Sequence, residues 1–146
     1  MSYTVVMPVI SVRISEEELH QRLKRKAAED QVGVSRLVER LIDEGLRMAT
    51  HPAVLFRSGP SGRRPVLVAG PEVADAVSAV IGGDVQPGQR RSRAAEMLAI
   101  PESMVDAALL YYAEFTEEID NLLALRAEVA EREEAAWRRQ HQLLRS

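Results

Sequence analysis

The chain has 146 residues, of which 46% are hydrophobic and 4% aromatic, and this composition is typical of one or two small helical domains. It contains no cysteine, so disulfides and thiolate metal sites are excluded and a reducing cytoplasm is the natural setting. The N-terminal segment lacks the basic region and long apolar core of a secretory signal, and no apolar run approaches membrane-spanning length. We therefore expect a soluble, cytoplasmic protein with no membrane partner.

The formal net charge of −3 is distributed unevenly. Residues 1–70 contain 11 Lys and Arg against 8 Asp and Glu, a balance of +3, whereas residues 71–146 contain 8 against 14, a balance of −6. DNA affinity depends on neutralising phosphates, which an acidic surface does not do. The two halves are therefore expected to bind different partners.

A strict apolar and polar alternation in residues 9–14 runs directly into a predicted helix start. The pattern predicts a strand whose successive side chains lie on opposite faces. Two copies paired antiparallel would bury one face on their own helices and present the other at a width that fits a DNA major groove. The inward positions are Ile10, Val12 and Ile14, and the outward positions are Val9, Ser11 and Arg13.

Two short amphipathic helices are predicted next. Ser15 is placed as the N-cap of the first helix, with Glu18 three residues later to complete a capping box. After a break at residues 30–33, Ser35 is placed as the cap of the second helix. The apolar faces exceed what one strand and two such helices can bury, so we expect an obligate dimer. These faces comprise Leu19, Leu23 and Ala27 in the first helix and Leu37, Val38, Leu41, Ile42 and Leu46 in the second.

With this order of elements, residues 9–49 resemble the MetJ/Arc/CopG ribbon-helix-helix family. The resemblance implies a paired ribbon that contacts DNA bases through its outward residues. It also implies a phosphate clamp at the start of the second helix, where free backbone amides and the helix dipole favour an anion. The DNA-binding residues implied are Val9, Ser11, Arg13, Val34, Ser35 and Arg36. The alternative is that the strand is an edge of an ordinary α+β domain.

His51-Pro52 marks a boundary, because the residue before a proline is displaced from helical geometry. Two β-prone runs, residues 53–57 and 64–68, then flank residues 58–62 and predict a hairpin with a flexible tip. This loop of glycine and arginine could hold a phosphate, although a solvated turn is the more frequent role of such a loop. The arginines at the tip are Arg57, Arg63 and Arg64.

The following segment is predicted to be helical with two breaks. Pro71 is placed in the first turn of a helix that ends at Gly82-Gly83, and Ser92 opens the next helix. Ile100-Pro101 then turns the chain into a helix that begins near Glu102, with the spacing of a helix-turn-helix. Carboxylates at the front of its second helix repel phosphates, so we interpret this unit as a packing scaffold rather than a DNA reader. The residues at that front are Glu102, Ser103 and Asp106.

The last helix is predicted to begin with Thr116 as its N-cap and to carry apolar pairs one heptad apart. The half-heptad positions are polar, which is poor for a two-stranded coiled coil but suits a helix in another protein's groove. Trp137, the single tryptophan, is the expected anchor of that interface. The apolar pairs are Leu122/Leu123, Val129/Ala130, Ala136/Trp137 and Leu143/Leu144, and the polar positions are Arg126, Glu133 and Gln140.

The sequence does not indicate an enzyme. The three histidines, His20, His51 and His141, are far apart without ligand spacing and are expected to be solvated. A cluster of four acids could bind a divalent cation, but it more often complements a helix dipole. No nucleophile elbow, phosphate loop or dinucleotide fingerprint occurs, so no metal or other cofactor is expected. The acids of the cluster are Glu114, Glu117, Glu118 and Asp120.

Residues 51–120 are similar to a small helical domain that follows a DNA-binding module in some bacterial antitoxins. This similarity rests on the His-Pro start, the Ile-Pro turn and the run from Tyr111 to Asp120. The whole chain thus resembles a VapB-like antitoxin of a type II toxin–antitoxin module. The resemblance implies a PIN-domain ribonuclease as the toxin and autorepression of the operon through operator DNA.

The expected fold is mainly α with a short N-terminal β-strand: a ribbon-helix-helix dimer, a small β-hairpin and helical (helix-turn-helix-like) domain, and a long C-terminal helix. The expected domains are residues 1–50, 51–120 and 121–146. A homodimer or higher oligomer is expected. A stand-alone ribbon-helix-helix repressor and an adaptor that binds only protein are the alternatives. The expected toxin-binding residues are Leu122, Leu123, Val129, Trp137, Arg138, Arg139 and Leu143.

Overall fold

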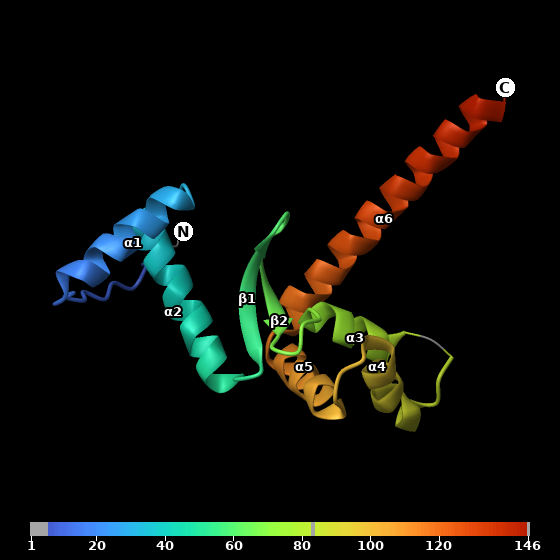
Figure 1. The fold of residues 1–146 in the computed structure, drawn as a ribbon, viewed down its shortest axis with the longest axis horizontal. Coiled ribbons are helices and arrows are strands. Elements are labelled where there is room, and N and C mark those ends of the chain that lie inside the picture. The colour runs from blue at the N-terminus through green and yellow to red at the C-terminus, as the bar shows by residue number, and fades with distance from the viewer. Residues whose placement is uncertain (1–5, 83, 146) are drawn as a thin grey trace, which may run out of the picture. The chain divides into compact units, whose positions relative to one another are not determined.

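The computed structural model describes residues 6–82 and 84–145, which are mostly helical with one antiparallel hairpin (Figure 1). The chain divides into two compact units, unit 1 (Met1–Glu44) and unit 2 (Gly45–Ser146). The mainly helical class and the hairpin predicted from the sequence are confirmed. The elements in order are α1 (Glu17–Glu29), α2 (Val34–Thr50), β1 (Val54–Gly59), β2 (Gly62–Leu67), α3 (Val73–Ile81), a 3-10 turn η1 (Pro87–Gln89), α4 (Arg90–Leu98), α5 (Glu102–Glu114) and α6 (Thr116–Arg145).

Unit 1 contains α1, most of α2 and an N-terminal segment that carries no regular secondary structure from residue 6 to residue 16. The predicted capping box at Ser15 is wrong, because α1 begins at Glu17 and its cap residue, Glu16, makes no side-chain capping bond. Glu17 and Glu18 in the first turn instead complement the positive end of the helix dipole.

The predicted break after α1 is present and has a clear geometry. Gln31 adopts the left-handed conformation with φ 55°, and the amides of Gln31 and Val32 donate to the carbonyls of Ala28 and Ala27. This is the pattern of a Schellman motif, which satisfies the last carbonyls of a helix. The cap predicted at Ser35 is wrong, since α2 already begins at Val34 and Ser35 lies inside its first turn.

Unit 2 begins with the hairpin. β1 and β2 pair antiparallel, with Val54 opposite Leu67 and Gly59 opposite Gly62. The connection is the two-residue turn Pro60-Ser61, shorter than the predicted loop of residues 58–62, because the strand pairing continues to the glycines.

Three helices with small residues on their facing surfaces form the centre of unit 2. Ala74, Ala76, Ala94 and Ala108 are fully or almost fully buried, which lets α3, α4 and α5 approach closely. One continuous core results, with one face of the hairpin and the start of α6 packed against it. The buried side chains of this core are Val54, Leu67, Val73, Ala74, Ala76, Val77, Ala94, Ala95, Ile100, Val105, Ala108, Tyr111 and Ile119.

Three helix starts in unit 2 differ from the sequence prediction. Pro71 lies before the cap of α3, since Glu72 is the cap residue and forms a reciprocal capping box with Asp75. α4 begins at Arg90 because the 3-10 turn η1 leads directly into it, so Ser92 lies within the helix. The hydroxyl of Thr116 donates to the carbonyl of Tyr112 at 2.7 Å, so it closes the end of α5 instead of capping α6.

The ends of the other helices agree better with the sequence. α3 stops at Gly82, as predicted, while Gly83 lies outside the described residues. The turn between α4 and α5 contains Ala99 in the left-handed conformation, φ 53°, followed by buried Ile100. Among the described residues, no helix combines the length and apolar composition that a membrane crossing requires.

The first turn of α6 contributes to the core, which leads to a stability prediction. Ile119 is completely buried, so Ile119→Ala should lower the free energy of unfolding by about 2–4 kcal/mol through lost burial and a cavity. The matched control is Leu144→Ala near the exposed end of the same helix, which should change it by less than about 0.5 kcal/mol. Urea denaturation followed by circular dichroism measures both, and equal losses would contradict this packing.

Candidate nucleic-acid interface and partner-binding helix

The strand predicted at residues 9–14 is not formed in the single chain, where this segment is irregular and exposed. Val9 and Ile10, predicted to lie on opposite faces, are 87% and 86% exposed, and Ser11, Val12 and Arg13 are exposed as well. The outward residues are thus accessible, and the inward residues lack the cover that an apolar strand face requires.

The predicted phosphate clamp lies at the exposed first turn of α2. Val34, Ser35 and Arg36 are all exposed, and the first amide to find an intrahelical acceptor is that of Leu37, which donates to the carbonyl of Gly33. This first turn contains no acidic residue. Three backbone amides therefore lie at the positive end of a helix dipole, an arrangement that favours an anion.

An ion-pair cluster joins α1 to α2 within unit 1. Arg40 pairs with Asp30 at 2.9 Å and approaches Glu44 at 3.7 Å, and Lys26 pairs with Asp30 at 3.1 Å. Hydrogen bonds from Arg40 and Lys26 hold the pKa of Asp30 below its ordinary value. The cluster fixes the two helices at the end where the Schellman motif reverses the chain.

An open hollow of about 420 Å³ lies on the same two helices. Its apolar lining consists of Leu19, Leu23 and Leu41, of which Leu19 and Leu41 are exposed. Basic side chains, Arg22, Arg25 and Lys26, line the rest together with Glu29. Among the described residues of unit 1, the buried apolar side chains are Ala27 and Leu37, so most of the predicted apolar faces are not covered within one chain.

The lowered pKa of Asp30 predicts how acid acts on unit 1. Because the folded-state pKa is below the unfolded value, the stabilisation by this carboxylate is fully present above about pH 4 and is lost as the pH falls through the folded-state pKa. The difference in urea midpoint between wild type and Asp30→Asn should therefore shrink from about pH 7 to about pH 3. Glu39→Gln, on the exposed surface of α2, is the control. A difference that is the same at both pH values would contradict the ion-pair cluster.

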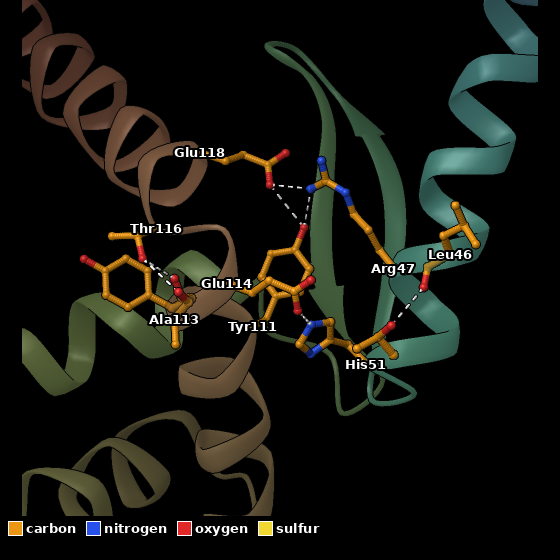
Figure 2. A network of polar contacts seen from close by, with 10 residues as sticks. Leu46, Arg47, His51, Tyr111, Ala113, Glu114, Thr116 and Glu118 are labelled. Carbon is orange, nitrogen blue, oxygen red and sulfur yellow. Dashed lines mark hydrogen bonds and ion pairs between the residues drawn. The ribbon is translucent and has the colours of Figure 1, made fainter. Parts of the chain in front are cut away.

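A polar network in unit 2 anchors the last turn of α2 (Figure 2). Arg47 donates to the hydroxyl of Tyr111 at 2.9 Å and to the carboxylate of Glu118 at 2.6 Å, and the Tyr111 hydroxyl donates to Glu118 at 3.1 Å. The Arg47 guanidinium also lies 4.0 Å from the centre of the Phe115 ring. Burial raises the pKa of Tyr111, so its hydroxyl remains a neutral donor.

His51 extends this network and corrects the expectation of a solvated histidine. It is 5% exposed, its Nε2 lies 2.6 Å from a carboxylate oxygen of Glu114, and its ring makes edge contacts with Tyr111 and Phe115. Pro52 ends the helix here, which turns the histidine into the interior. We call the six residues of this network the α2 anchor: Arg47, His51, Tyr111, Glu114, Phe115 and Glu118.

The acidic cluster predicted around the start of α6 is dispersed over separate partners. Glu114 bonds to His51, Glu118 to Arg47, and Asp120 accepts a hydrogen bond from the Tyr112 hydroxyl at 2.6 Å. In the described ranges, no group of three or more histidine and acidic side chains is arranged to hold a metal ion.

α6 divides into a packed part and an exposed part. Leu122 and Leu123 are half-buried against the core of unit 2, so the domain itself covers part of the surface that was expected to be free for a partner. The polar half-heptad residue Arg126 pairs with Glu72 and Asp75 at the start of α3, which fixes this end of α6. The first three turns of the helix therefore belong to the folded domain.

The rest of α6 extends beyond the core, where Figure 1 shows it as a single long helix. Val129, Trp137 and Leu143 are exposed, Trp137 to 57% and Leu143 to 78%. Arg138 pairs with Glu134 one turn earlier, and Arg139 is exposed. Of the seven predicted toxin-binding residues, the five that follow Leu123 thus lie on this exposed part.

In the helix-turn-helix-like pair α4 and α5, ion pairs between the two helices neutralise the carboxylates at the front of α5. Arg91 on α4 forms ion pairs with Asp106 and Glu102 on α5, both at 2.5 Å, and Ser103 lies exposed beside them. The carboxylates at the front of α5 thus hold the two helices together, which is a structural role for them.

No protein-family model matches this chain, and searches of curated proteins and of solved structures return no match. Sequence reasoning did not find the α2 anchor, whose partners His51 and Glu114 are 63 residues apart. The available signal was the position of His51 before a proline, and it does not identify the partner.

Proposed function

We propose that this protein is the antitoxin of a type II toxin–antitoxin module. Two chains pair through the segments at residues 9–14, the resulting ribbon and the first turns of α2 bind operator DNA, and the exposed part of α6 binds the toxin. The observation that carries the proposal is the exposure of an irregular segment of alternating apolar and polar residues that precedes two helices whose apolar faces are not covered within one chain.

A second copy of the chain is the partner that best buries the exposed apolar residues of unit 1. Antiparallel pairing gives each strand segment its missing hydrogen-bond partner and places Ile10, Val12 and Ile14 of both chains on the four helices. The same pairing brings apolar surface to the hollow that Leu19, Leu23 and Leu41 line. Burial of this area, at about 25 cal/mol per Å², is the driving force for the dimer.

DNA is the partner favoured by the opposite strand face. Arg13 lies on it, and an arginine can contact a guanine edge with two hydrogen bonds. The acid-free first turn of α2 supplies amides for a phosphate, and a dimer presents both features twice. Base contact and backbone contact are then divided between the ribbon and α2.

A protein partner is favoured by the exposed part of α6. Val129, Trp137 and Leu143 project from a helix that has already left its own core. A large aromatic side chain in that setting is typical of an interface anchor. The PIN-domain ribonuclease as the toxin class follows only from the resemblance to VapB-like antitoxins.

The second candidate is a stand-alone ribbon-helix-helix repressor. It is favoured by the continuous core of unit 2, which is complete without a partner and would serve as a domain that sets the oligomeric state. An open reading frame for a small toxin beside the gene supports the antitoxin, and its absence supports the repressor.

The proposed base contact predicts that Arg13→Ala abolishes preferential binding to the DNA upstream of the gene. Each lost contact to a guanine edge costs about 1–3 kcal/mol and occurs twice in a dimer. Lys24→Ala, an exposed change on α1, should keep the preference. Gel-shift titrations at fixed salt compare the upstream DNA with random DNA, and an unchanged preference in Arg13→Ala would remove the ribbon from the mechanism.

The proposed toxin contact predicts that Trp137→Ala weakens binding to the protein encoded beside this gene by about 2–4 kcal/mol. Leu110→Ala, an exposed change on α5, is the control. Because the first turns of α6 belong to the core, the matched truncation ends after Ala127 and keeps the domain folded. Calorimetry measures the affinity, and full neutralisation of the toxin by the truncated chain would exclude the exposed part of α6.

A further inference from the structure

We propose that the hairpin face carrying Arg57 and Arg64 binds the phosphate backbone of DNA beside the operator. This inference rests on the proposed function, since it adds a second DNA contact to the one made by unit 1. It assigns a role to the hairpin of unit 2, which takes no part in the proposed DNA contact of unit 1 or in the proposed toxin contact of α6.

The first observation is a repulsive pair at the tip of the hairpin. In the β1–β2 register Arg57 lies directly opposite Arg64, so both side chains belong to the same face of the ribbon. Like charges directly opposite each other destabilise an antiparallel pair. The next pair, Ser58 and Arg63, adds a third guanidinium group close by on the other face.

The second observation is that the carboxylates near Arg64 also form ion pairs with another arginine. Arg64 pairs with Glu72 at 3.0 Å, but Glu72 also pairs with Arg126, which bonds to Asp75 at 2.8 Å as well. Burial and the nearby charge of Arg64 both lower the pKa of Arg126, so the two arginines repel each other. Within the described part of the chain, no carboxylate pairs with Arg57, and the face keeps an excess of positive charge.

The third observation is a polar hollow at this place. It measures about 170 Å³ and is lined by Arg57, Ser58, Arg64, Val66, Gly70 and Glu72. The Arg64 guanidinium lies where a Cβ on Gly59 would stand, so the glycine allows this side chain to lie flat along the strand beside the hollow. Two cross-strand guanidinium groups can thus approach one anion from both sides.

A phosphate of a nucleic-acid backbone fits this geometry best. Guanidinium groups bind phosphate with paired hydrogen bonds, and Arg57 is exposed on this face of the hairpin. β1 also begins only four residues after α2 ends, so the hairpin directly follows the helix whose first turn is proposed to bind phosphate.

The test compares the full-length wild type with Arg57→Gln and Arg93→Gln. Arg93 is an exposed arginine on α4, so its variant removes the same charge away from the hairpin. Arg57→Lys keeps the charge at the hairpin. The probe is a fluorescent random-sequence duplex of roughly 30 base pairs, because backbone contacts do not depend on sequence, and the dissociation constant is measured from about 50 to 200 mM salt.

Arg57→Gln is expected to reduce the slope of log affinity against log salt by about 1 for each chain in contact, hence by about 2 for a dimer. Arg93→Gln and Arg57→Lys should keep the wild-type slope. Arg57→Gln removes one of two opposed like charges, so thermal melting should place it no lower than the wild type. A wild-type slope in Arg57→Gln, with Arg13 still required for the preference for upstream DNA, overturns the hairpin contact and leaves the proposed function intact. A wild-type chain that binds neither the duplex nor the upstream DNA overturns both.

Discussion

The constraint on which the rest of the protein depends is that unit 1 has more apolar side chains than one copy can bury. Ala27 and Leu37 are the buried apolar residues among those described there, whereas Val9, Ile10 and Leu41 are exposed. The Schellman motif and the pairing of Arg40 with Asp30 fix the two helices without covering these faces. Because a small unit of this kind gains most of its stability from the apolar area it buries, folding and association of two copies are expected to be one event.

Unit 2, in contrast, buries its apolar core within one chain. Small side chains on α3, α4 and α5 allow close packing, and Ile119 adds the start of α6 to the core. The α2 anchor then holds the last turn of α2 in this unit through two charged contacts, Arg47 with Glu118 and His51 with Glu114. The last turn of α2, which belongs to unit 2, is therefore held by residues of α5 and α6.

Periodicity predicted the helices and the hairpin because hydrophobic burial along one element is a local property of the sequence. The caps were placed less well. Ser15, Ser35 and Ser92 are good capping residues by type, but a 3-10 turn or a neighbouring glutamate or glycine shifted each helix start by one to three residues. The α2 anchor could not be predicted, since Arg47 and Glu118 are 71 residues apart and any exposed acid is an equally good partner on sequence grounds. For the same reason the strand pairing and the DNA contact of Arg13 stay predictions, because both require a second molecule.

The exposed part of α6 stays helical although it does not pack against the core of unit 2. Arg132 pairs with Glu128 and Arg138 with Glu134, each one turn apart with the acid first, the more favourable orientation for such pairs. Each pair adds only a few tenths of a kcal/mol, so together with alanines they support a helix at the margin of stability in water. Trp137 stacks on His141 at 3.9 Å but remains more than half exposed. A helix that is formed in advance loses less conformational entropy when a partner covers its apolar side chains, so this design favours binding by a preformed surface over folding on contact.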